Sequence, residues 1–214
     1  DDVILNGDQT TTDNINASGA TISKSTAGKA HWLLGFDGLV HLAMVDNSAN
    51  QSVDHSAAIS NAAFTKGLAK LSKYATPRRQ SEVVFISDVR THIAALGVSA
   101  VETLANYGTR ATISTGELAQ VYGVPYIRSA QMRVARTSGL VADTAGSNTA
   151  GRIMSLNTSQ WRVGFRRSIT LENYREPGKG QTTMYVSFRI ALTERSGTRS
   201  SATHTSVVYD ITGI

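Results

Sequence analysis

The sequence of 214 residues contains no cysteine, which excludes disulfide frameworks, thiolate metal sites and cysteine nucleophiles. Charged residues are few, at 17%, and no apolar run approaches the roughly 20 residues that a membrane-spanning helix needs. Asp1 and Asp2 are acidic, whereas a signal peptide begins with a basic segment. We therefore expect no signal peptide and no membrane partner. A chain that begins without Met is expected to be a fragment or a processed product.

The common catalytic and cofactor-binding motifs are also missing. The sequence has no H-E-x-x-H metal motif, no G-x-S-x-G nucleophile elbow and no G-x-G-x-x-G dinucleotide fingerprint. Residues 178–182 contain Gly-Lys-Gly, but they precede an expected strand, whereas a phosphate-binding loop opens a helix. We predict no enzyme activity, no cofactor and no metal site. A hydrolase that uses Asp and His is the weaker alternative.

The strongest pattern lies between Trp161 and Glu194, where every second residue is apolar in two long runs. Strict alternation indicates strands with one apolar face, and the Pro-Gly-Lys-Gly sequence at 177–180 indicates a turn between them. The apolar residues are Trp161, Val163, Phe165, Ile169 and Leu171 in the first run, and Met184, Val186, Phe188, Ile190 and Leu192 in the second.

If the strands end at Glu176 and Gln181, antiparallel pairing places apolar residues opposite each other. The predicted pairs are Leu171 with Val186, Ile169 with Phe188, and Phe165 with Leu192. At about 3.3 Å per residue, each arm would extend roughly 45 Å. We therefore predict a projecting hairpin whose half-apolar sheet needs a covering partner, which is a first indication of assembly.

Arginines form the strongest charged cluster, and the candidate contact residues are Arg162, Arg166, Arg167 and Arg195. The predicted register places Arg162 opposite Arg195, an unfavourable like-charge pair. Either the pairing twists away there or an acidic partner covers it. Residues 1–60 hold seven Asp and two Lys, whereas residues 150–200 hold nine Arg or Lys and three Glu. The partner could be phosphate or the acidic part of another copy, and solvated arginines remain the simpler interpretation.

The remaining pattern predicts an α+β fold in two regions. We expect a compact α/β domain at 55–150, inserted into a strand-rich domain made of 1–54 and 151–214. The expected helices are 39–44, 56–74 with Ser56 as N-cap, and 89–96 with Ser87 or Asp88 as cap and Gly97 at its end. The expected strands are 82–86, 112–115, 124–127, 152–156 and 202–211.

Several of these segments, in this order, resemble the major capsid proteins of tailed bacteriophages, the coat proteins with the Johnson fold. Residues 3–8 resemble the end of that family's spine helix. Residues 83–89 and 93–96 resemble a strand and helix of its axial domain, and 116–127 resemble a later strand there. Residues 162–167 and 186–192 resemble the hairpin of its peripheral domain, and residues from 202 onward resemble its closing strand. The resemblance covers nearly the whole chain, without the family's N-terminal arm, extended loop and most of the spine helix.

The resemblance implies a structural subunit of an icosahedral phage or prophage shell, located in the virion capsid and assembled in the host cytoplasm. Copies of the full-length protein would form pentamers and hexamers around packaged DNA, with a scaffold, a protease and a portal as further partners. This fragment alone is expected to be monomeric or weakly associated. Two alternatives stay open, a nucleic-acid-binding module and the shell protein of a cellular nanocompartment with the same fold.

Overall fold

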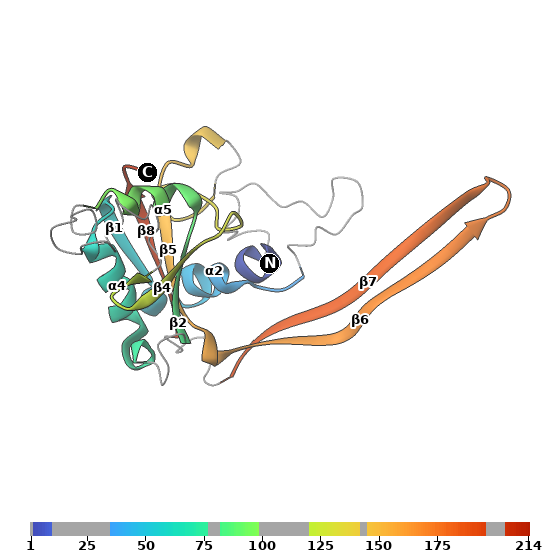
Figure 1. The fold of residues 1–214 in the computed structure, drawn as a ribbon, viewed down its shortest axis with the longest axis horizontal. Helices are drawn as coiled ribbons and strands as arrows, with labels where there is room; N and C mark the ends of the chain where they lie inside the picture. Colours follow the sequence, from blue (N-terminus) through green and yellow to red (C-terminus); the bar gives the residue numbers. More distant parts are fainter. Residues whose placement is uncertain (1, 10–34, 77–81, 99–119, 142–144, 196–203) are drawn as a thin grey trace, which may run out of the picture.

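The computed structural model describes residues 2–9, 35–76, 82–98, 120–141, 145–195 and 204–214. These residues form a body, in which helices pack on one sheet, and a long two-stranded hairpin that projects from it (Figure 1). The predicted strand at 112–115 lies outside the described residues. Among the described residues, no helix combines the length and apolar character needed to cross a membrane.

The sheet of the body has six strands in the order β1-β8-β5-β2-β4-β3. β1 pairs with β8 in parallel, as β2 does with β4, whereas β5 is antiparallel to both β2 and β8. The strands are β1 (Ser52–Ala58), β2 (Val83–Ser87), β3 (Gln120–Val121), β4 (Val124–Arg128), β5 (Gly151–Asn157) and β8 (Thr205–Thr212). The predicted strands at 82–86, 124–127 and 152–156 are thus confirmed within one or two residues.

Both faces of the sheet are covered, so its central strands alternate between two apolar cores. Phe85 of β2 and Val208 of β8 face one core, with Phe64 and Leu71 of α4 and residues of α5. Their sequence neighbours Val84 and Val207 face the other core, beside α1 and α2. This double coverage explains why every residue of β5 is buried.

Helices cover the sheet, and the bounds of several follow local sequence signals. They are α1 (Asp2–Asn6), α2 (Leu39–His41), η2 (Leu42–Asp46), α3 (Ser48–Gln51), α4 (Asn61–Leu71), η3 (Ser72–Ala75), α5 (Val89–Leu96), η6 (Ala145–Ser147) and η7 (Thr158–Gln160). Asp88 caps α5 by accepting a 2.9 Å hydrogen bond from the Thr91 backbone N–H, and Gly97 follows its last residue. Both signals were predicted, and the helix at 39–44 is confirmed as α2 continued by η2.

The prediction that a helix begins at Ser56 is wrong. Residues Ser52–Ala58 form β1, and the helix α4 begins only at Asn61, with Ser60 in the N-cap position. The small and polar residues of this segment set no strong local preference, so pairing with β8 decides its conformation.

Strands of the body come from both predicted domains. β2 and β4 lie within 55–150, whereas β5 and β8 lie within 151–214, and β5 pairs with β2 along its length. The two segments therefore share one sheet, and the boundary between the predicted axial-like and peripheral-like domains stays a prediction.

Candidate functional site

The hairpin is the most distinctive surface of the molecule. β6 (Trp161–Glu176) and β7 (Gln181–Glu194) are paired only with each other and extend away from the body (Figure 1). Six apolar side chains of the predicted stripe, which we call the outer stripe, are between 58% and 71% exposed. They are Phe165, Ile169, Leu171, Met184, Val186 and Phe188. Large exposed apolar patches of this kind mark interaction surfaces in soluble proteins.

The predicted register holds near the turn but not toward the body. Leu171 lies opposite Val186, as expected, whereas Phe165 lies opposite Ile190 instead of Leu192. The register shifts twice on the way, once between residues 165 and 167 and once between 167 and 170. The predicted pair Ile169–Phe188 falls in the second irregularity.

These two shifts each add one residue to β6, like β-bulges. A single shift would move one apolar stripe to the opposite face, but two shifts restore the parity. Both stripes therefore stay on one face although the individual pairs change. Bulges also bend a strand and increase its twist, which fits the curved course of the hairpin (Figure 1).

The predicted like-charge pair of Arg162 and Arg195 is wrong. Arg162 lies opposite Thr193 because of the two shifts. Arg195 follows the end of β7, where its backbone N–H donates a 2.7 Å hydrogen bond to the Gln160 carbonyl. The side chains of Arg162, Arg166 and Arg195 are exposed, and that of Arg167 is outside the described residues. No described contact assigns a partner to these arginines, so their role as contact residues stays a prediction.

The root of the hairpin is fixed to the body by an aromatic stack. Trp161, the first residue of β6, lies parallel to His204, with ring centroids 4.9 Å apart and an interplanar angle of 4°. The Trp161 indole N–H also donates a 3.0 Å hydrogen bond to Thr205 Oγ1 in β8. Trp161 and Leu192 pack against the core beside α1 and α2. The hairpin is therefore anchored at its root and exposed beyond it.

His204 is buried at the root, with only 1% of its surface exposed. Burial lowers its pKa to about 4, although the Glu194 carboxylate lies 3.7 Å from its Nε2. The imidazole is therefore neutral at pH 7 and acts as an aromatic packing group. A histidine flanked by two threonines gives no sequence signal for this role.

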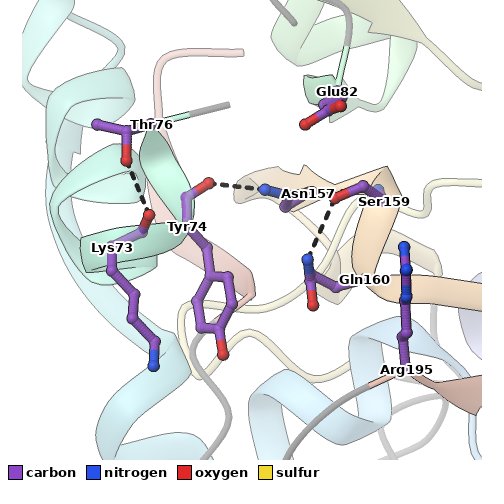
Figure 2. Close-up of a pocket in the computed structure, with 8 residues that line it drawn as sticks. All are labelled: Lys73, Tyr74, Thr76, Glu82, Asn157, Ser159, Gln160 and Arg195. Carbon is purple, nitrogen blue, oxygen red and sulfur yellow. Dashed lines mark hydrogen bonds between the residues drawn. The ribbon is translucent and has the colours of Figure 1, made fainter. Parts of the chain in front are cut away.

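A polar pocket of about 270 Å³ lies beside the root. Figure 2 shows Lys73, Tyr74 and Thr76 on one side of it, and Ser159, Gln160 and Arg195 on the other. The Asn157 amide crosses between the two sides and donates a 2.9 Å hydrogen bond to the Tyr74 carbonyl.

The pocket lining carries two cations, Lys73 and Arg195, and one acid, Glu82. Among these lining residues there is neither a pair of carboxylates nor a nucleophile with an imidazole, the arrangements that acid–base and nucleophilic catalysis use. The pocket is lined by residues from the body and from the root of the hairpin, and its lining gives no support to the hydrolase alternative.

Comparison with known proteins identifies the fold. No protein-family model and no curated protein matches the sequence. A chain from Mycobacterium phage Che8 superimposes with a TM-score of 0.51 and 14% identity, over 79% of this chain and 55% of that one. A chain of the bacteriophage PhiM1 mature capsid superimposes with a TM-score of 0.51 and 10% identity, over 72% of this chain and 47% of that one. A chain of the capsid of an empty GTA particle superimposes with a TM-score of 0.51 and 12% identity, over 91% of this chain and 59% of that one.

The chain therefore has a phage major capsid protein-like fold, as its resemblance to that family predicted. It spans about half the length of the chains that it matches, between 47% and 59%. At 10–14% identity the similarity shows the fold alone, and function must be argued from the surfaces of this chain.

Proposed function

We propose that this chain is part of the shell subunit of an icosahedral phage or prophage capsid and has a structural rather than a catalytic role. The observation that carries the proposal is the outer stripe, an apolar surface on a projecting arm in a protein with a capsid-like fold. In this proposal residues 1–54 and 151–214 supply the peripheral part, including the hairpin, and residues 55–150 supply the axial part.

The energetics of the outer stripe suit a repeated contact. Fully burying one large apolar side chain contributes about 1.5–3 kcal/mol, whereas association costs about 4–15 kcal/mol in lost freedom. Six partly covered side chains therefore give a weak individual contact. In a closed shell each subunit makes many such contacts at once, and multivalency turns weak contacts into a stable assembly.

The full-length subunits would assemble into pentamers and hexamers, with a scaffold, a protease and a portal as partners and DNA inside the shell. The exposed side chains of Arg162, Arg166 and Arg195 are available for an acidic surface of a neighbouring copy or for packaged DNA.

Sedimentation velocity over a range of concentrations tests the role of the outer stripe. We expect reversible, concentration-dependent self-association of the wild type, and loss of it in a Phe165→Ser, Phe188→Ser double variant. Ile93→Ser is the matched control, because Ile93 is also 58% exposed but lies on α5 in the body. Because this fragment alone is expected to associate weakly at most, the decisive comparison is made at concentrations where the wild type self-associates. Association of the double variant equal to that of Ile93→Ser would count against the proposal. Electron microscopy of the full-length protein expressed with its scaffold then tests for closed shells.

The exposed arginines of the hairpin favour one second candidate, a nucleic-acid-binding module. Duplex DNA binding that falls steeply with salt, and weakens in Arg162→Ala and Arg166→Ala variants, would support it. If those variants bind DNA as the wild type does while the outer-stripe variant loses self-association, the shell proposal stands alone. Encapsulated nucleic acid in purified particles would distinguish a virus shell from a nanocompartment.

A further inference from the structure

Outside the hairpin, four side chains with metal-ligand chemistry meet where α1 and α2 lie side by side (Figure 1). Asp8 follows α1, Asp37 precedes α2, and His41 is the last residue of α2. The ligand atoms of these three all lie within 4.8 Å of one another. Asp46, the last residue of η2, adds a carboxylate 3.5 Å from His41 Nε2.

Two glycines bring the acidic residues together. The Gly38 N–H donates a 2.7 Å hydrogen bond to the Gly7 carbonyl, and this joins the residue before Asp8 to the residue after Asp37. A Cβ atom at Gly7 would lie 2.2 Å from the Phe36 carbonyl oxygen, and one at Gly38 would lie 2.6 Å from the Gly7 nitrogen. Only glycine permits so close an approach of two backbones.

A π-helical turn brings in the fourth group. Residues Leu42–Asp46 form the π-helix η2, closed by a 3.1 Å hydrogen bond from the Asn47 N–H to the Leu42 carbonyl. In a π-helix, residues five positions apart become neighbours, as His41 and Asp46 are here, whereas in an α-helix they point in different directions. π-helical turns occur frequently at functional sites.

The cluster gathers three carboxylates around one deeply buried imidazole. Asp8 is fully buried, and only 2% of the His41 side chain is exposed. A carboxylate as deeply buried as that of Asp8 attracts a cation, because burying a negative charge is costly unless it is paired or bound to a metal. The Asp37 carboxylate is held in place by a 2.8 Å hydrogen bond from the Gln9 backbone N–H, in the way that outer groups orient metal ligands.

His41 supplies the independent indication of a ligand. Its Nδ1 is buried and lacks a hydrogen-bond partner, although Asp8 Oδ1 lies 3.3 Å away. Two ligands bound at about 2.0–2.1 Å to a tetrahedral metal ion lie about 3.3 Å apart. The separation thus matches two atoms that share a cation.

We propose that Asp8, Asp37 and His41 Nδ1 bind one divalent transition-metal ion of the Zn²⁺ or Mn²⁺ class, while Asp46 orients the imidazole from its other nitrogen, Nε2. An imidazole nitrogen among carboxylates favours these ions over Ca²⁺, which takes oxygen ligands. The ion clamps the end of α1 to α2. This site is independent of the outer stripe, so it goes beyond the proposed shell function and can fail or hold separately.

Metal titration of the chelator-stripped chain tests the site. We expect one Zn²⁺ or Mn²⁺ bound per chain by isothermal titration calorimetry, a rise in the thermal unfolding midpoint, and weaker binding of Ca²⁺. His41→Gln and Asp8→Asn should each lower the affinity at least tenfold. Asp54→Asn, which changes an exposed carboxylate outside the cluster, should bind as the wild type does.

A readout on the wild type keeps the test decisive if a cluster variant fails to fold. Co²⁺ added to the stripped chain should give visible d–d absorption that Zn²⁺ abolishes by competition. The proposal is overturned if the wild type binds no stoichiometric ion and shows no such absorption. It is also overturned if a folded His41→Gln variant binds the ion with unchanged affinity, because the cluster is then a buried ion pair around a protonated imidazole.

Discussion

The buried His204 at the hairpin root makes the stability of the body depend on pH. In the unfolded chain its pKa has the ordinary value of 6.5, whereas burial lowers it to about 4 in the folded protein. Between these values the unfolded state binds a proton that the folded state does not. Stability is therefore retained above pH 6.5 and lost as the pH falls toward 4.

The full difference in pKa corresponds to about 3 kcal/mol. Lowering the pH from 7 to 4.5 should remove roughly 2 kcal/mol of that contribution. Among the described residues, the groups around the imidazole are the Trp161 and Tyr74 rings and the Glu194 carboxylate. Only Glu194 favours the charged form, and burial outweighs it.

The measurement is urea unfolding of the wild type and a His204→Phe variant at several pH values between 4.5 and 7. Phenylalanine keeps an aromatic ring against Trp161 but cannot bind a proton, so the variant reports the acid sensitivity of every other group. The wild type should lose roughly 2 kcal/mol more than the variant over this range. Parallel curves for the two proteins would refute the assignment of a neutral, buried His204.

Three further substitutions probe the body by urea unfolding. Asp88→Ala removes the N-cap of α5 and should cost about 1–2 kcal/mol, whereas Asp88→Asn should retain most of the cap; equal losses would contradict the capping role. Gly38→Ala places a Cβ atom against backbone atoms and should cost about 1–3 kcal/mol, whereas Gly164→Ala on the open hairpin should stay within about 0.5 kcal/mol. Phe85→Ala empties a fully buried position that packs edge-on against Phe64 and should cost about 3–5 kcal/mol; a loss below about 1 kcal/mol would show that this core is not tightly packed.

Local signals in the sequence correctly predicted the helix and strand bounds that depend on nearby residues. The Asp88 cap and Gly97 bound α5 as expected, and the alternation of apolar residues fixed the strands Trp161–Glu176 and Gln181–Glu194. The ordered motifs also predicted the capsid-like fold that the solved structures share.

Features that depend on distant residues were not predictable in this way. Ser56 was expected to start a helix, but its segment pairs with β8, far along the chain. The alternation of apolar residues also did not predict the two register shifts near residue 167. His41 lies only four residues after Asp37, but Asp8 is distant in the sequence and is brought to this pair by the packing of α1 against α2.

The hairpin separates the residues that hold the fold from those available for association. At the root, Trp161 and Leu192 pack on the core of the body, so substitutions there should alter both stability and the direction of the arm. Beyond the root, β6 and β7 have only each other as sheet neighbours. Each cross-strand pair, such as Leu171 with Val186, contributes about 0.2–1 kcal/mol, and an isolated two-stranded hairpin is marginally stable in water. A partner that covers the outer stripe would therefore stabilise the arm as well as bind it, which couples ordering of the hairpin to assembly.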